Sequence, residues 1–320
     1  MPPISPELRD YMNRIIETLR DKPVKEILSY AIFNEQEEAE YYRKLARHTP
    51  RESVKALFLQ MADESAEHYK RLYELFKKLY PNEEPVEVEA PPVEVAPFYP
   101  KFESVDDYLE ALEYCMKSEL FAKDTYEILS QRASSEDARI VFVQLSNMEK
   151  EHYMRIKKAY DLLAEFRDRR TLPENLEPGA YLFPDKVKAR YVLLDLIANA
   201  KDIYVFSRDP PKKLREWFKR GDINFAWIST APVKGSITPK MLIESGTGMC
   251  ELLKKGNVVL LVENFEVVAM SVGFKKAFEC VSMLRDAAIM YGSYLLVHAN
   301  RPAMSEREWA VLEAEFEVIG

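Results

Sequence analysis

The feature that most constrains this chain is an ungapped internal repeat in its first half. A shift of 84 residues places Glu35 on Glu119 and His68 on His152. The same shift also aligns Tyr42 with Tyr126, Leu45 with Leu129, Glu52 with Glu136, Phe58 with Phe142, Gln60 with Gln144, Glu67 with Glu151 and Arg71 with Arg155. Such a repeat predicts two copies of one supersecondary unit, related by a pseudo-two-fold axis. We therefore expect the two glutamates, and the two histidines, to face each other across one core.

The residues before Gly179 are suited to long helices. They include none of the nine glycines of the chain, and Ser5-Pro6 and Thr49-Pro50 mark helix starts, because proline is favoured in the first helical turn after a capping residue. With Glu52, Thr49-Pro50 is interpreted as a capping box. We expect a short leading helix and then long helices at about residues 23–47, 50–79, 104–132 and 135–168.

A segment rich in proline and glutamate, residues 81–103, separates the second long helix from the third. Its prolines exclude a helix and favour an extended chain. Two short-looped hairpins joined by one long crossover have ferritin-like connectivity, and a disordered interdomain linker is the alternative. We therefore predict an all-α ferritin-like four-helix bundle over residues 1–170.

The repeated glutamates and histidines have the spacing of a two-metal site. In bundles of this kind, two iron or manganese ions are held by one Glu from each of two helices and a Glu-x-x-His pair from each of the others, since residues three apart share a helix face. The second hairpin supplies this full set with Glu119, Glu149 and His152. The first hairpin supplies Glu35 and His68.

One carboxylate of this pattern is missing. Ser65 stands three residues before His68, where the pattern has a glutamate. Glu38 shares a helix face with Glu35 and is the best substitute, at the metal position that lacks a carboxylate. Glu64 is a poorer one, because it is turned by about 100° around the helix from residue 65. The pattern therefore predicts two unequal metal positions.

These motifs resemble the ferritin-like domain of the rubrerythrin family over residues 23–168. The first copy runs from Ala31-Ile-Phe-Asn-Glu35 to Tyr42 and then Met61-Ala-Asp-Glu-Ser65-Ala-Glu-His68; the second runs from Ser118-Glu119 to Tyr126 and then Leu145-Ser-Asn-Met-Glu149-Lys-Glu-His152. The resemblance implies metal ligands at Glu35, His68, Glu119, Glu149 and His152, with Glu38 in the place of an extra glutamate of some rubrerythrins. The implied cofactor is a di-iron centre, with manganese or zinc as alternatives.

The leading functional hypothesis is a rubrerythrin-like metal-binding protein, specifically a di-iron oxidoreductase acting on peroxide or dioxygen, or a ferroxidase. Cys115, Cys250 and Cys280 are too few for the rubredoxin module that delivers electrons in rubrerythrins, so an external electron donor is expected, as is a homodimer. The alternative is a non-enzymatic metal-sensing, signalling or scaffold protein. A decayed site with no metal is a further alternative, but burying several carboxylates without a cation is costly. Tyr42 and Tyr126 are expected to be core side chains whose hydroxyls bond carboxylates.

The composition changes after Gly179, and all three tryptophans lie beyond it. Short β-rich runs alternate with helical segments there. We expect strands at Ile203–Phe206, Ile223–Ile228, Val258–Val262 and Tyr294–Val297, and helices at about 185–199, 212–220, 239–255, 273–291 and 306–314. This alternation predicts an α/β domain over residues 180–320 with a mainly parallel sheet covered on both faces.

Ligands of such sheets bind beyond the carboxyl ends of the strands. The expected ends carry Ser207-Arg208-Asp209, Ser229-Thr230, Glu263-Asn264 and His298-Ala-Asn300. The sequence has no Gly-x-x-x-x-Gly-Lys-Ser/Thr loop, so nucleotide binding is a minor alternative and no cofactor site is predicted in this half. Arg208-Asp-Pro-Pro211, Trp227-Ile-Ser229 and Glu263-Asn-Phe-Glu266 resemble an archaeal domain of unknown function, number 835. The resemblance implies a sensory or partner-binding role and no enzyme class.

Charge and hydropathy exclude two classes of partner. The net charge is −8 and the basic residues are interleaved with acidic ones, which argues against nucleic acid. No uninterrupted apolar stretch approaches membrane-spanning length, which argues against a membrane. The three scattered cysteines indicate a reducing compartment. We therefore expect a cytoplasmic protein.

Overall fold

The computed structural model describes residues 6–91, 100–133, 135–231 and 233–320. The chain divides into two compact units. The first contains residues 1–50 and 57–161, and the second contains residues 51–56 and 162–320. The boundary for independent folding, placed between residues 170 and 180 from the sequence, stays a prediction.

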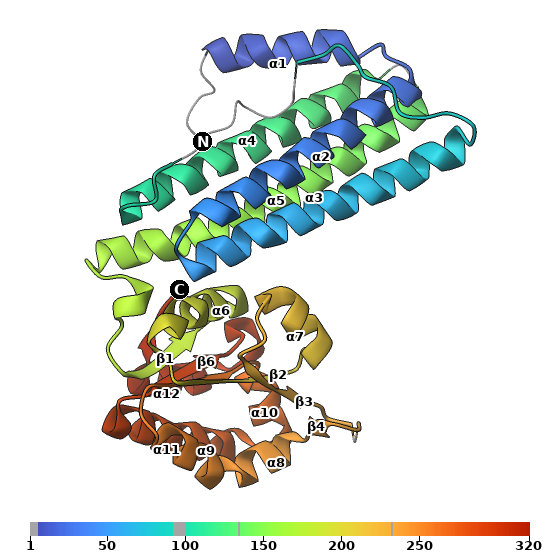
Figure 1. Ribbon diagram of the computed structural model, residues 1–320. Coiled ribbons are helices and arrows are strands. Elements are labelled where there is room, and N and C mark those ends of the chain that lie inside the picture. Colours follow the sequence, from blue (N-terminus) through green and yellow to red (C-terminus); the bar gives the residue numbers. More distant parts are fainter. Residues whose placement is uncertain (1–5, 92–99, 134, 232) are drawn as a thin grey trace. The chain divides into compact units, whose positions relative to one another are not determined.

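The first unit is all-α, as predicted. Its long helices lie side by side, and a shorter helix precedes them (Figure 1). The helices are α1 Pro6–Leu19, α2 Val24–His48, α3 Glu52–Leu79, α4 Val105–Arg132 and α5 Glu136–Asp168. The leading helix packs on α4, where the rings of Tyr11 and Phe121 lie 5.9 Å apart. Part of the predicted crossover, residues 92–99, lies outside the described residues.

The start of α4 has the hydrogen bonds of a capping box, whereas the capping box expected before α3 is absent. Ser104 caps α4, because its hydroxyl accepts from the Asp107 backbone N–H while the Asp107 carboxylate accepts from the Ser104 N–H. The capping box predicted at Thr49 is wrong. Thr49 is the C-cap of α2, its N–H donates to the Leu45 carbonyl at 3.1 Å, and its hydroxyl has no hydrogen-bond partner. The reason is that α3 begins only at Glu52, which leaves the hydroxyl too far from the first free amides.

The second unit is an α/β domain with a seven-stranded sheet in the order β4-β3-β2-β5-β6-β1-β7. The strands are β1 Gly179–Phe183, β2 Asp202–Ser207, β3 Asn224–Ile228, β4 Ser236–Ile237, β5 Val258–Val262, β6 Tyr294–His298 and β7 Glu317–Val318. All of its strand pairings are parallel. The predicted mainly parallel sheet is therefore confirmed, and β1, β4 and β7 are additions to the predicted strands.

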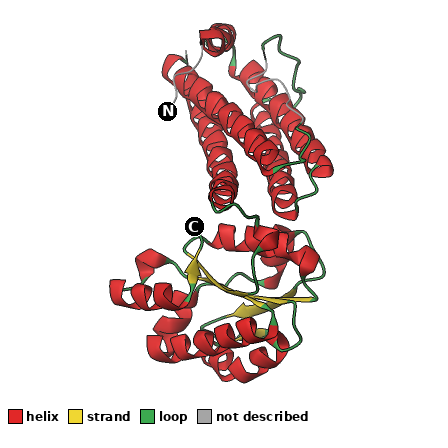
Figure 2. Ribbon diagram, turned by 90° about the vertical axis from the view of Figure 1, so that its left-hand side faces the viewer, coloured by secondary structure: helices red, strands yellow, loops and turns green. Residues whose placement is uncertain are grey.

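Helices cover both faces of this sheet (Figure 2). They are α6 Lys186–Leu196, α7 Pro211–Phe218, α8 Pro239–Glu244, α9 Gly246–Leu253, α10 Phe265–Val272, α11 Phe274–Tyr291 and α12 Glu306–Glu315, with 3₁₀ turns at Pro173–Asn175, Ile197–Asn199 and Arg301–Ala303. The predicted helix at 239–255 is two helices, because the chain breaks at Ser245, which caps α8. Every residue of β5 and β6 is buried, as expected for strands covered on both faces.

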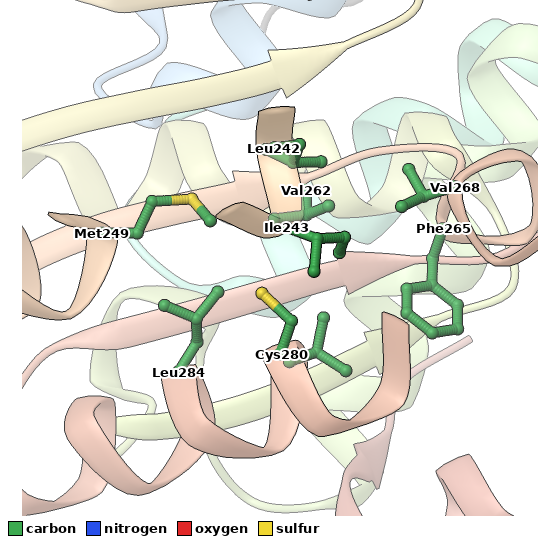
Figure 3. A pocket seen from close by; sticks show the side chains of 9 residues that line it. Leu242, Ile243, Met249, Val262, Phe265, Val268, Cys280 and Leu284 are labelled. Atoms are coloured by element: carbon green, nitrogen blue, oxygen red, sulfur yellow. The ribbon is translucent and has the colours of Figure 1, made fainter. Parts of the chain in front are cut away.

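The core on one face of the sheet contains a small apolar cavity. Residues of β5, α8, α9, α10 and α11 line it, including Leu242, Val262, Phe265 and Cys280 (Figure 3). Its volume is about 10 Å³, which is at or below the space that a single water molecule needs. This cavity is a packing gap and offers no room for a ligand.

Candidate metal centre

The six predicted ligands all point into the interior of the bundle. Glu35 and Glu38 come from α2, His68 from α3, Glu119 from α4, and Glu149 and His152 from α5. Their exposed fractions are 3%, 2%, 6%, 3%, 7% and 0%, respectively. Four carboxylates and two imidazoles thus share a space from which water is almost fully excluded.

His152 lies at the centre of one group of donors. Its Nδ1 atom is 3.5 Å from Glu38 Oε1, 3.5 Å from Glu119 Oε2 and 3.6 Å from Glu149 Oε2. One donor atom from each of these four residues lies within 4.8 Å of the others. Three oxygens and one nitrogen at this spacing could bind one metal ion.

His68 and Glu35 form the other side of the cluster. The Nδ1 atom of His68 is 3.5 Å from Glu35 Oε1. The rings of His68 and His152 stack, with centroids 5.0 Å apart. The structure therefore brings together the residues that the repeat pairs, and both histidines turn Nδ1 toward carboxylates.

Several of these buried polar atoms have no hydrogen-bond partner. They are both carboxylate oxygens of Glu35, Nδ1 of His68, and Nδ1 and Nε2 of His152. A buried polar atom without a partner costs about 1–3 kcal/mol, and more if it is charged. A cation among these atoms removes that cost, so the residues present fit a bound metal.

Glu38 supplies a fourth carboxylate to the cluster. The Ser65 hydroxyl donates to the Met61 carbonyl of its own helix at 3.0 Å. Glu38 groups with His152, and its negative charge also acts on His68, whose pKa it raises against the effect of burial. Its role as the substitute ligand at the position of His68 stays a prediction. The total of four carboxylates and two histidines equals that of the complete pattern.

Glu64 stays outside the cluster, in agreement with its ranking as the poorer substitute. Its carboxylate pairs with the guanidinium of Arg155. Both side chains are about a third exposed, at 31% each. This pair lies at the edge of the bundle interior.

Burial and crowding shift the proton affinities of the cluster. Burial raises the pKa of Glu35 and Glu119 well above the usual range, and neighbouring carboxylates add to the effect. Burial also raises the pKa of Glu149 to about 7. It lowers the pKa of His68 to about 4, helped by His152. Burial alone would lower the pKa of His152, but the surrounding carboxylates outweigh it and raise that pKa well above its usual value. Without a metal, the cluster therefore retains protons.

The two repeated tyrosines are both buried, as expected. The Tyr42 hydroxyl donates to Oε1 of Glu119, so the expectation of a carboxylate partner is correct for Tyr42. For Tyr126 that expectation stays a prediction.

A second polar cluster lies at the carboxyl ends of β2 and β5 in the α/β unit. Arg190 of α6 donates to Glu263 through Nε at 2.6 Å and through Nη2 at 2.8 Å, and to Asp209 at 2.7 Å. The Ser207 hydroxyl also donates to Glu263, which is fully buried. Sequence reasoning found the three strand-end residues but missed Arg190, whose place is set by the sheet order. The charged groups of this cluster are paired with one another.

The free backbone N–H groups at the neighbouring helix start also have an acceptor within the chain. The Asp185 side chain accepts from the backbone N–H groups of Val187 and Lys188 at the start of α6. These amides would otherwise attract an anion such as a phosphate. At the next strand end, His298 Nδ1 accepts from the Asn264 N–H at 3.1 Å. The geometry gives no support to nucleotide binding.

Helix connectivity and the buried glutamate and histidine side chains together define a ferritin-like bundle with a candidate di-metal centre. Residues 26–160 match the family model described as Rubrerythrin. Residues 183–316 match the model described as Protein of unknown function (DUF835). The two matches follow one another along the chain, in its N-terminal and C-terminal halves, and both resemblances inferred from the sequence are confirmed.

One similar solved structure is that of "Hypothetical Protein Pfu-1136390-001 From Pyrococcus furiosus". It is 26% identical, with a TM-score of 0.40, and the likeness covers 49% of this chain and 98% of that chain. No curated protein matches the chain. Among the described residues, none of the helices combines the length and the apolar character needed to cross a bilayer.

Proposed function

We propose that the first unit is a rubrerythrin-like metal-binding domain that acts as a di-iron oxidoreductase on peroxide or dioxygen, or as a ferroxidase. Four carboxylates, those of Glu35, Glu38, Glu119 and Glu149, meet in the bundle core. Within the described residues none of them forms an ion pair with a lysine or arginine. An ionised carboxylate that is buried unpaired costs several kcal/mol. Two divalent cations would balance the four negative charges, and this match is the observation that carries the proposal.

The residues divide between two positions. Glu38, Glu119, Glu149 and His152 form a complete donor set, and Glu35 with His68 begins a second set that shares carboxylates with the first. Oxygen and imidazole donors suit iron, manganese and zinc. A bound iron or manganese pair would supply reversible one-electron redox chemistry. The chain itself contributes near-complete exclusion of water.

Electrons would come from an external donor. The chain has three cysteines, too few for the four-cysteine module that delivers electrons in rubrerythrins. A cytoplasmic location belongs to the same proposal, since free thiols are typical of reducing compartments. The proposal also includes a homodimer.

A non-enzymatic metal sensor or scaffold is the second candidate. It is favoured by the α/β unit. There, Arg190 pairs with the carboxylates at the strand ends, and Asp185 accepts from the backbone N–H groups at the start of α6. Metal binding without turnover of peroxide or dioxygen would support this candidate. Turnover would support the oxidoreductase.

Metal analysis of the full-length protein, purified without chelators, tests the proposal. We expect iron, manganese or zinc, and a rise in the melting temperature when these metals are added to metal-free protein, as ligand linkage requires. Glu149→Gln should lose both effects. Glu64→Gln is the matched control, because Glu64 lies outside the cluster, and it should keep both. Protein that contains no metal and shows no thermal shift would refute metal binding.

A further inference from the structure

The outward face of α5 carries an apolar stripe. Ile140, Val143 and Met154 are 45%, 39% and 48% exposed, and the exposed residues Asn147 and Lys150 lie between them. Steps of three and four residues keep all five side chains on one helix face, which we call the α5 stripe. Among the described residues of the first unit, three of the five large apolar side chains that are exposed belong to it. Exposed apolar side chains that gather on one face in this way mark a contact surface.

A groove runs beside the α5 stripe. Its volume is about 440 Å³, and the residues that line it include Lys123 and Glu127 of α4 together with Val143, Asn147 and Lys150 of the stripe. The stripe therefore forms one wall of a hollow that has room for side chains of another molecule.

The repeat indicates that the bundle fold does not require the α5 stripe. The residues of α3 that the repeat aligns with it are, in order, Ala56, Leu59, Asp63, Ala66 and Lys70. An aspartate thus stands at the middle of the equivalent face and a lysine at its end. The apolar residues at the two ends of the α5 stripe therefore need a reason other than the packing of the bundle.

The α5 stripe is complementary to itself under a two-fold axis. Asn147 lies at its middle, and in an antiparallel pair of α5 helices with the axis at this residue, positions equally far from it on opposite sides face each other. Ile140 then meets Met154 of the second copy, since each lies seven residues from Asn147. Glu136 meets Lys158 of the second copy, since each lies eleven residues, or about three turns, from Asn147. Apolar side chains thus pack on apolar ones, and an acid faces a base.

Other arrangements lack this match. Moving the second copy by one turn along the helix would set Ile140 against Lys150 or Lys158 of that copy. The same two-fold contact on α3 would set Asp63 against Asp63 of the second copy, and like charges that meet in an interface repel. The complementarity is therefore specific to α5 with the axis at Asn147.

We infer that the α5 stripe is the contact surface of a symmetric dimer, in which a second copy of this chain packs its own α5 antiparallel across Asn147. This inference rests on the proposed function, which includes a homodimer, and adds the surface through which the two copies bind. The Asn147 amide has both donors and an acceptor, so two copies can hydrogen-bond to each other at the axis. Because Glu149 and His152 of α5 are buried inside the bundle, the two candidate metal centres of the dimer would lie on either side of this helix pair.

Light scattering coupled to size-exclusion chromatography tests the surface. The full-length protein should elute with twice the chain mass of 37.3 kDa. Val143→Glu combined with Met154→Glu should give a monomer, because the contact would then bury unpaired carboxylates. Both side chains are exposed in the single chain, so circular dichroism should show an unchanged helical spectrum. Leu79→Glu is the matched control, since Leu79 is also 48% exposed but lies at the end of α3, and it should stay dimeric. A monomeric unmodified protein, or a dimer that survives the double substitution, would overturn the inference.

A cysteine at the axis gives a second test that does not depend on disrupting the contact. Asn147→Cys should link two copies by a disulfide when the full-length protein is oxidised by air with a copper–phenanthroline catalyst, because this residue faces its own copy. The three native cysteines are buried. Asp63→Cys, at the aligned position of α3, is the control and should stay unlinked. Failure of Asn147→Cys to cross-link, or equal cross-linking of both variants, would contradict an axis at this residue.

A charge exchange tests the register. Glu136→Lys should raise the dissociation constant of the dimer several-fold in analytical ultracentrifugation, and Lys158→Glu in the same chain should restore it, because the two partners exchange signs. No change with Glu136→Lys, or no recovery in the double variant, would overturn the register. Metal content measured on the same samples separates this inference from the metal proposal. A metal-containing monomer would overturn the dimer surface alone, whereas a metal-free dimer of the predicted register would overturn metal binding alone.

Discussion

The imidazole rings of His68 and His152 stack across the bundle, with centroids 5.0 Å apart and planes inclined by 20°. Two positive charges at this separation in a buried space would repel strongly. The pKa of His68 is accordingly lowered to about 4 by burial and by His152, whereas carboxylates raise that of His152 in spite of its burial. In the metal-free protein, the pKa values of the two rings are therefore shifted in opposite directions.

The metal-free protein should lose stability as the pH rises from 4.5 toward 7. The pKa of Glu149 is raised from 4.5 to about 7 by burial, so in this range the folded protein holds a proton that the unfolded chain has released. The free energy of unfolding therefore falls with rising pH. Glu35, Glu119 and His152 act in the same direction, and His68 opposes them between about 4 and 6.5. Urea titrations of the apo-protein followed by circular dichroism across this range measure the slope, and a flat or rising profile would contradict the prediction.

Two unequal metal affinities are expected. The metal position at His152 has three carboxylate ligands. The position at His68 has Glu35 and shares the other carboxylates with the first position. Fewer anionic ligands weaken metal binding. Isothermal titration with ferrous or manganous ion should show the His152 position filling first. Glu149→Ala should abolish binding, because it removes a central carboxylate. Two equal sites in the unmodified protein would disprove the asymmetry.

A carboxylate moved from α2 to α3 should be tolerated. Glu38→Ala should weaken the tighter position, since Glu38 groups with His152. Ser65→Glu in the same chain should restore two metals, because the number of carboxylates returns to four. Metal content per chain gives the answer, and a double variant that binds no more metal than Glu38→Ala would show that the location of the fourth carboxylate matters as much as its presence.

Breaking the buried ion pair of the α/β unit should destabilise that unit. Arg190→Met leaves Glu263 charged and buried, which typically costs about 3–5 kcal/mol. Urea unfolding followed by tryptophan fluorescence reports on this unit, because all three tryptophans lie in it. Lys212→Met is the control. Its pair with Glu216 is exposed, at 89% and 63%, and the expected change is within about 0.5 kcal/mol.

Residues 1–170 should fold when expressed alone, because the long helices and the candidate site lie within them. Circular dichroism of the fragment should show a strongly helical spectrum and a cooperative melt. An insoluble or unfolded fragment would show that the bundle needs the rest of the chain.

The repeat made the bundle and four of its candidate ligand residues predictable, because identity at a fixed spacing is a local signal. Glu149 has Ser65 as its counterpart and was predictable from its position three residues before His152. The grouping of Glu38 with His152 depends on how the helices are rotated against one another, which spacing does not encode.

The parallel type of the sheet was predictable from the sequence, but the order of its strands was not. The buried strands at Val258–Val262 and Tyr294–His298 have strong apolar runs, whereas β4 and β7 have two residues each and show no periodicity. Arg190 reaches Glu263 only because β1 and β5 lie on either side of β6. That relation joins segments far apart in the sequence.

The transfer of one carboxylate from α3 to α2 has a consequence for design. All four long helices present inward positions at the level of the two histidines, so the fold limits how many oxygen donors can meet there without dictating which helix delivers each one. A ferritin-like bundle therefore allows its metal ligands to be redistributed among its helices. New coordination spheres can be built in it by exchanging glutamate and small residues between facing helices, one pair at a time, while the backbone stays as it is.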